Sequence, residues 1–232
     1  MIAVLFPTRF EGEAFAKGLG GKPVWKNRNG VEMIEGKLGG RQVVVAIVGV
    51  GPKIATLRTQ KILKFYPFQY VILAGFAGAL NENLERGHVL IASKYCQTDT
   101  YNYLKLIPNF DMAALVSTDK VVATAEDKAK LREKSGCQMV DMETESVAKV
   151  VEQHGIEFIA VRAISDLYNE SLPIEALESA YDYRAGKPTP LKLCIYFLFH
   201  PQEISAFKRF LEPLPGVRAS LTAFLFAAVP DL

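Results

Sequence analysis

Hydrophobic residues along the chain gather into five short runs that are rich in Val and Ile. The runs are "MIAVLF", "QVVVAIVGV", "QYVILAGFAGA", "GHVLIAS" and "FIAVRAIS". Uninterrupted apolar runs of this length are typical of strands that are covered on both faces, because a strand with one wet face alternates apolar and polar residues. The pattern therefore predicts five buried strands.

Amphipathic segments between these runs predict helices at residues 11–19, 52–66 and 142–155. Pro52 suits the first position of the second helix, and Gly155 suits the end of the third. Strands that alternate with helices predict an α/β fold, in which a parallel or mixed sheet carries helices on both faces.

One further strand is predicted just before the second run. Residues 32–49 have the pattern of an antiparallel hairpin that turns at Gly39 and Gly40. No repeat, low-complexity tract or linker divides the sequence, which predicts a single domain over residues 1–232. A helical C-terminal segment is expected from about residue 190, after a loop at 183–190.

Composition narrows the function classes. Half of the 232 residues are hydrophobic, 22% are charged, and the formal net charge is +2. This composition can form a large core, and without a basic tract it gives no indication of nucleic-acid binding. The three Cys and three His are scattered, so neither disulfides, a metal site nor a cofactor is expected. The chain starts without the features of a signal peptide, and we expect a cytoplasmic protein.

Candidate chemistry follows the strands, because open α/β sheets bind ligands at the carboxyl ends of their strands. Acidic residues or glycine turns occur at four of these ends: "PTRFEGEAF", "VGVGPKIA", "AGFAGAL" and "SDLYNE". A fifth group, "MVDMETESVA", places Asp141 and Glu143 where an apolar run meets a helix. The sequence therefore predicts that several carboxyl groups share one rim of the sheet.

Each feature also has a purely structural interpretation. The glycine turns are weak signals alone, and "AGFAGAL" is also compatible with a tight turn. Asp166 could cap a helix, Glu143 could be a solvated helix residue, and Arg162 could form a structural ion pair.

Taken together, the motifs resemble the purine nucleoside phosphorylase and nucleosidase superfamily. The resemblance covers residues 1 to about 180 and depends mainly on "VDMETESVA" followed by "VRAISDLYNE". The pattern is most similar to methylthioadenosine/S-adenosylhomocysteine nucleosidases, with hopanoid-associated nucleosidases and futalosine hydrolases as relatives. It implies a three-layer fold, a purine nucleoside as ligand and a homodimer.

The resemblance implies that Glu143 accepts hydrogen bonds from the ribose hydroxyls and that Met142 packs against the sugar. A vicinal diol offers two O–H donors, which suit the two oxygens of a carboxylate. Asp141, in the same motif, is a further candidate binding residue, although the motif gives it no ribose contact.

The resemblance also implies that Asp166 lies beside the purine, that Ser165 orients it, and that Arg162 lies on the nucleophile side of the sugar. Cleavage of a C–N glycosidic bond is easier when the base leaves as a neutral species. A carboxylic acid near purine N7 can donate that proton if it is protonated near neutral pH.

The resemblance further implies that a third carboxylate, from the loop after the first strand, is the base that activates water. "PTRFEGEAF" offers Glu11 and Glu13, and the alignment with the family's helix favours Glu13.

The remaining candidate binding residues come from the glycine segments and from one position that departs from the family pattern. They are Val50, Phe76, Ala77, Gly78 and Val121. Phe76 stands where the nucleosidases carry Ser, and Val121 falls near their purine-stacking Phe.

Hydrolysis is favoured over phosphorolysis because the segment around Phe76 lacks a basic residue that could pair with phosphate. Phosphorolysis, with Arg9 on the phosphate, remains an alternative, as does a nucleoside-binding module without catalysis. The C-terminal segment has the mixture of Phe, Leu, Lys and Arg that suits a peripheral membrane contact.

Overall fold

The computed structural model describes residues 1–21, 24–104, 107, 110–182 and 187–232. Within these ranges one large sheet has the strand order β2-β3-β4-β1-β5-β10-β6-β7, and β8 and β9 extend it beside the end of β5. These strands are β1 (Ile2–Phe6), β2 (Lys26–Arg28), β3 (Val31–Leu38), β4 (Arg41–Ile47), β5 (Tyr70–Ala79), β6 (Val89–Ala92), β7 (Phe110–Ala113), β8 (Leu115–Ser117), β9 (Met139–Asp141) and β10 (Glu157–Asp166).

The sheet is mixed, as predicted. Strands β4, β1, β5 and β10 run parallel, whereas β6 is antiparallel to β10. The predicted hairpin is confirmed, because β3 pairs antiparallel with β4 and the turn residues Gly39 and Gly40 both have positive φ. The segment 74–80 is not a tight turn, since β5 continues through it to Ala79.

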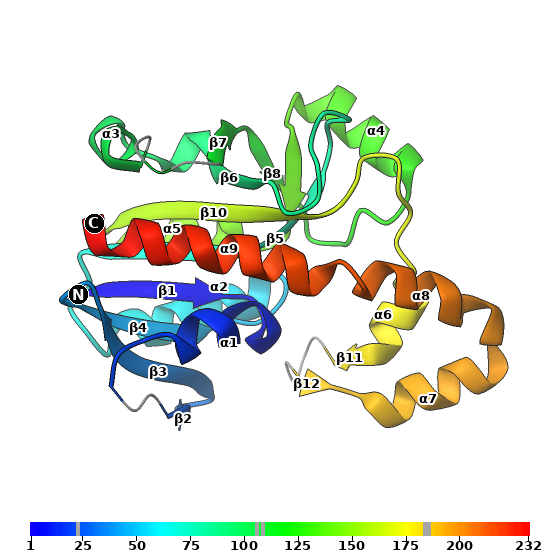
Figure 1. Ribbon diagram of the computed structural model, residues 1–232, viewed down its shortest axis with the longest axis horizontal. Helices are drawn as coiled ribbons and strands as arrows, with labels where there is room; N and C mark the ends of the chain where they lie inside the picture. Colours follow the sequence, from blue (N-terminus) through cyan, green and yellow to red (C-terminus); the bar gives the residue numbers. More distant parts are fainter. Residues whose placement is uncertain (22–23, 105–106, 108–109, 183–186) are drawn as a thin grey trace.

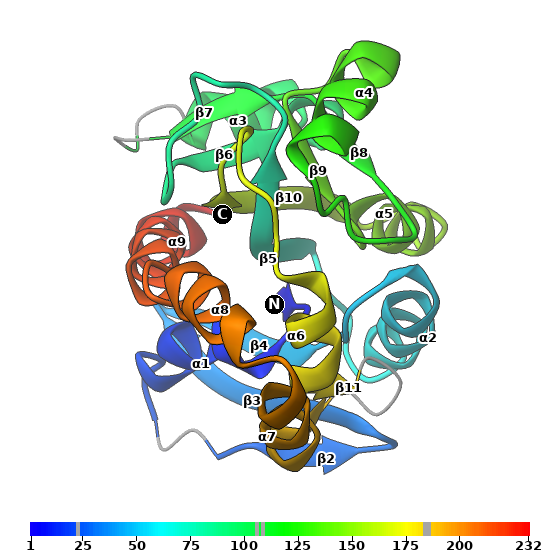
Figure 2. The same cartoon turned by 90° about the vertical axis from the view of Figure 1, so that its right-hand side faces the viewer.

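Helices cover both faces of the sheet (Figure 1, Figure 2). The helices are α1 (Arg9–Lys17), α2 (Pro52–Leu63), α3 (Thr98–Leu104), α4 (Ala125–Ser135), α5 (Thr144–Glu152), α6 (Ile174–Ala180), α7 (Pro190–Phe199), α8 (Ile204–Leu211) and α9 (Leu214–Ala228). Helices α1 and α9 lie on one face, and α2 and α5 on the other (Figure 2). The three-layer prediction is confirmed.

Two hydrophobic cores form between the layers. In β1, Ala3 and Leu5 point into the core beneath α2 and α5, and Val4 and Phe6 point into the core beneath α1 and α9. Side chains of a strand alternate between its two faces, so a strand buried on both sides must be apolar at every position. This explains the uninterrupted runs in the sequence.

Helix positions follow the sequence signals closely. Pro52 opens α2, as expected. Helix α5 ends at Glu152 with Gln153 at its cap, and the predicted cap Gly155 comes two residues later with a φ of 65°. Asp166 caps no helix, because it ends β10 and α6 begins only at Ile174.

The C-terminal segment divides into an outer arm and a core helix. Helices α7 and α8 form the arm together with α6 and the short strands β11 (Tyr181–Asp182) and β12 (Lys187–Pro188) (Figure 1). Helix α9 returns across the sheet and buries Leu221, Phe224 and Leu225. Residues 183–186 of the predicted loop lie outside the described residues.

Within the described ranges, no helix has both the length and the apolar character to cross a bilayer.

Candidate active site

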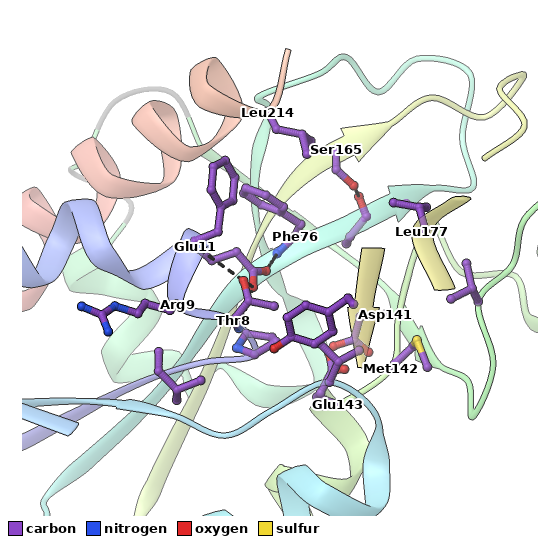
Figure 3. A pocket seen from close by; sticks show the side chains of 18 of the residues that line it. Thr8, Arg9, Glu11, Phe76, Asp141, Met142, Glu143, Ser165, Leu177 and Leu214 are labelled. Atoms are coloured by element: carbon purple, nitrogen blue, oxygen red, sulfur yellow. Dashed lines mark hydrogen bonds between the residues drawn. The ribbon is translucent and has the colours of Figure 1, made fainter. Parts of the chain in front are cut away.

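A cavity of about 1160 Å³ opens at the carboxyl ends of the parallel strands. The loops after β1 and β4, the ends of β5 and β10, and the β9–α5 junction form its floor (Figure 3). Residues of α6, α8 and α9 close one side. Every site residue predicted from the sequence lines it except Arg162, which is buried directly behind it: the lining includes Glu13, Val50, Phe76, Ala77, Gly78, Val121, Asp141, Met142, Glu143, Ser165 and Asp166.

Glu11 is fixed in the cavity by the start of α1. Thr8 caps this helix, and Glu11 completes a capping box, since its Oε2 accepts from Thr8 N at 2.8 Å and from Thr8 Oγ1 at 2.5 Å. Its Oε1 accepts from Phe76 N at 2.9 Å (Figure 3). Burial raises the pKa of the Glu11 carboxyl group, whereas these hydrogen bonds and the nearby Arg162 charge act in the opposite direction.

Glu13 has a different environment, although it also lines the cavity. Its side chain is about one-third exposed, and its carboxylate forms a salt bridge of 3.2 Å with Lys17 one helical turn later. Two residues of separation place Glu11 and Glu13 on different faces of α1. The capping box "TRFE" is the sequence signal that distinguishes them.

Gly75 leaves room beneath the cavity for the charged side chains of Arg162 and Glu11 to lie close together. A Cβ atom there would lie 2.6 Å from Arg162 Nη1 and 3.0 Å from Glu11 Oε1, so any side chain would displace both groups. The parallel pairing of β5 with β10 places Arg162 directly beside Gly75.

Arg162 is fully buried and only partly paired. Its Nη2 donates to Asp141 Oδ2 at 2.5 Å and to Thr144 Oγ1 at 2.8 Å. Its Nε and Nη1 have no hydrogen-bond partner among the residues that the structure describes. Two nitrogens of a buried cation, which carry three N–H donors between them, therefore remain available, and Nη1 lies beside Gly75 with Glu11 Oε1.

Asp141 acts as a structural anchor in this arrangement. Its Oδ1 accepts from Ser117 Oγ at 2.5 Å, and its Oδ2 accepts from Thr144 N at 3.0 Å in addition to Arg162. Because both oxygens are used within the protein, Asp141 orients Arg162 and the start of α5.

Glu143 directs its carboxyl group into the cavity from the residue just before α5. Its Oε1 accepts from Gly51 N at 2.6 Å, and Gly51 adopts a φ of 90° that favours glycine. Burial and the neighbouring charge of Asp141 raise the pKa of Glu143 to about 8, despite the opposing influence of Arg162. Met142 lines the cavity beside it.

Asp166 is held from two sides. Ser165 Oγ lies 2.7 Å from its Oδ1, and Lys128 Nζ on α4 lies 2.6 Å from its Oδ2. A Cβ atom at Gly78 would lie only 2.9 Å from the same Oδ2, so the glycine makes room for the carboxylate.

Sequence reasoning missed Lys128 and the apolar wall from the C-terminal helices. Lys128 is fully buried although α4, "AEDKAKLREKS", is polar on all sides, so no periodic signal marks it. Phe210, Leu211 and Leu214 line the cavity from far along the chain.

Arg9, the phosphate candidate, stacks on Trp25, and its Nη1 lies 3.8 Å from Glu32 Oε2. Its guanidinium points away from the carboxyl groups of Glu11, Asp141 and Glu143 (Figure 3).

A family model described as the phosphorylase superfamily matches residues 1–115 and 108–185. The chain belongs to the phosphorylase superfamily. The match covers the strands and loops that carry Glu11, Glu143, Arg162 and Asp166, so the resemblance inferred from the motifs is confirmed.

Individual members of the superfamily are similar over much of the chain. The 5'-methylthioadenosine/S-adenosylhomocysteine nucleosidase of Staphylococcus aureus is 28% identical over 171 residues, which are 60% of this chain and 75% of that protein. A futalosine hydrolase mutant of Helicobacter pylori has a TM-score of 0.77 at 20% identity, covering 100% of this chain and 99% of that one. An S-adenosylhomocysteine nucleosidase from Streptococcus pyogenes has a TM-score of 0.76 at 16% identity, covering 100% and 96%.

Proposed function

We propose that this chain is a nucleosidase that hydrolyses the N-glycosidic bond of an adenosine-type nucleoside and releases the purine base. The observation that carries the proposal is the convergence of Glu11, Glu143 and Asp166, three buried carboxyl groups from different strand ends, on one cavity. The similarity to curated nucleosidases supports the reaction class.

The proposal assigns the two ends of the nucleoside to different carboxyl groups. Glu143 accepts hydrogen bonds from the ribose hydroxyls, and Met142 packs against the sugar beside it. Asp166 lies against the purine and gives a proton to N7 as the electrons of the C1′–N9 bond pass into the base. Proton donation to the leaving group typically contributes about 10²–10⁴-fold to the rate.

Water is activated on the other side of the sugar. Glu11, in place of the Glu13 favoured by the sequence, takes a proton from water as its oxygen bonds to C1′. The unpartnered Nε and Nη1 of Arg162 hold that water beside Glu11. Glu11 suits this role better because it is buried at the cavity floor, whereas Glu13 is engaged by Lys17.

The ion pairs that Arg9 and Arg162 already form favour hydrolysis over phosphorolysis. A bound phosphate dianion needs paired positive charge, whereas Arg9 is turned toward Glu32 and Arg162 is committed in part to Asp141. The apolar side chains of Phe10, Phe76, Leu211 and Leu214 favour a nucleoside with an apolar 5′ substituent.

The proposal extends to the setting of the enzyme. We place it in the cytoplasm as a homodimer. The predicted membrane contact would use the exposed apolar side chains of α7, among them Leu191, Leu198 and Phe199.

The test is to incubate the protein with a panel of 5′-substituted adenosines, with and without phosphate. We expect adenine and free ribose derivatives at a rate that phosphate does not change. Asp166→Asn is the control for a contaminating activity, and its rate should fall by about 10²–10⁴-fold. Ribose 1-phosphate as product would indicate a phosphorylase, and nucleoside binding without turnover would indicate a binding module.

A further inference from the structure

Lys128 is a buried cation in direct contact with the proposed acid. Its ammonium group is fully buried and donates to Asp166 Oδ2 at 2.6 Å, to Leu167 O at 2.6 Å and to Glu170 O at 3.1 Å. An ammonium has three donors, and all three are used. Only one of its acceptors is charged, so the ion pair with Asp166 compensates its charge.

Other charged groups near this pair are engaged elsewhere. The Glu170 carboxylate forms a salt bridge with Arg86 and accepts from Leu167 N at 2.9 Å. Arg86 Nε also donates to Ser165 O at 3.3 Å. Asp127, beside Lys128 on α4, accepts from Thr124 Oγ1, and Arg132 one turn later stacks over Tyr168. Ser165, on the other side of Asp166, has no charge.

The ion pair raises a question about the proposed reaction. Asp166 is to deliver a proton to the purine, yet both of its carboxyl oxygens accept hydrogen bonds, one from an ammonium and one from a hydroxyl group. In this arrangement both oxygens act as acceptors, so the proton for the purine has to be supplied to the carboxyl group. The proton must come from a neighbour, and the ammonium in contact with Asp166 has one.

We propose that Lys128 is a positioning residue that holds the proton which Asp166 passes to the leaving purine; this inference rests on the proposed function. A proton first moves from Lys128 Nζ to Oδ2 of the Asp166 carboxylate, and as the C1′–N9 bond breaks the new O–H transfers this proton to N7. Lys128 ends as a neutral amine and Asp166 again as a carboxylate. After the products leave, Lys128 takes a proton from water and Glu11 releases the one it had accepted.

Direct contact makes this transfer possible. The Lys128 ammonium already donates to Asp166 Oδ2 at 2.6 Å, so a proton can pass along an existing hydrogen bond. An arginine at the same position would keep its proton under all ordinary conditions. A role in anchoring the 167–170 loop alone would require only positive charge and donors, which an arginine also has.

The first measurement uses the wild-type enzyme and two substrates. Adenosine needs a proton on its leaving group, whereas 4-nitrophenyl β-riboside does not, because nitrophenolate leaves readily as an anion. We expect kcat for adenosine to fall at alkaline pH, where the proton for the leaving group is no longer available, and no such fall for the nitrophenyl riboside. A profile for adenosine without an alkaline limb would overturn the inference even if no variant folded.

The second measurement compares Lys128→Met with Lys128→Arg. Both should lower kcat for adenosine by about 10²-fold or more, the range of general acid catalysis, and spare the nitrophenyl riboside. In Lys128→Met the proton must reside on Asp166 itself, so the alkaline limb should move to lower pH. A limb that stays in place or moves to higher pH contradicts a proton-holding role.

Arg86→Met is the matched control, because Arg86 fixes the same loop through Glu170 and Ser165 without contacting Asp166. It should leave the alkaline limb where the wild type has it, and any loss should affect both substrates equally. If Lys128→Met behaves in the same way, Lys128 is only an anchor. A wild-type protein that releases no adenine would remove the proposed function itself, which is a separate result.

Discussion

At the scale of single residues, neighbours decide what a carboxyl group can do. Glu11 and Glu13 are two positions apart on one helix, yet one is buried at the cavity floor and the other pairs with a lysine at the surface. Asp141 and Glu143 are also two positions apart. The Asp141 carboxylate accepts hydrogen bonds from four donors, whereas the Glu143 carboxyl group accepts one, from Gly51 N. Residue type alone does not separate these roles.

The choice between the two candidate bases can be tested by the same substitution at both. Glu11→Gln removes the proton acceptor for water and should lower kcat by about 10²–10⁴-fold with a smaller change in KM. Glu13→Gln should stay near the wild-type rate. Thermal melts of both variants check that the change in the capping box has not unfolded the protein. Normal turnover by Glu11→Gln together with an inactive Glu13→Gln would reinstate Glu13.

At the scale of elements, the C-terminal helices differ sharply in how much they contribute to the hydrophobic core. No residue of α7 is buried, whereas α9 buries six residues, most of them against α1 and the sheet. Helix α9 also brings Leu214 to the cavity, next to Leu211 at the end of α8. The segment after residue 190 therefore completes both the core and the wall of the site.

A pair of identical substitutions measures this difference. Leu221→Ala removes a fully buried side chain from α9 and should lower the free energy of unfolding by about 2–5 kcal/mol. Leu198→Ala on α7, where the side chain is 78% exposed, should change it by no more than about 0.5 kcal/mol. Urea denaturation measures both values. Equal effects would mean that α9 does not close the core.

At the scale of the whole molecule, a site with buried acids should make stability depend on pH. Unfolded Glu143 has an ordinary pKa of 4.5, and the folded state raises it to about 8. Between these values the folded state binds more protons than the unfolded chain, so stability must fall as pH rises. The raised pKa of Glu11 acts in the same direction.

We therefore expect the melting temperature of the ligand-free protein to fall between pH 5 and about 8, beyond the change that its exposed groups produce. Glu143→Gln cannot titrate and should show a shallower fall over the same range. Melting curves of the two proteins at matched pH and ionic strength measure the difference. Parallel pH profiles would mean that Glu143 is not protonated in the folded protein over this range.

The order of the elements was encoded locally. Uninterrupted apolar runs marked the strands that are buried on both faces, Pro52 marked a helix start, and two glycines marked the hairpin turn. The motifs around Glu143 and Asp166 were equally local, so the sequence alone pointed to the superfamily and to two carboxyl groups that line the cavity. Short-range patterns record which residues are buried in the core, and the pattern of burial along the chain determines the fold class.

Contacts between distant segments were decided only in the tertiary structure. Lys128 is buried because β10 and its following loop surround α4 with acceptors about 40 residues away, and nothing in the polar sequence of that helix marks the position. Leu211 and Leu214 reach the cavity because α9 packs across the sheet. A local pattern records the preference of a residue for water or core, but its partners depend on how the layers assemble.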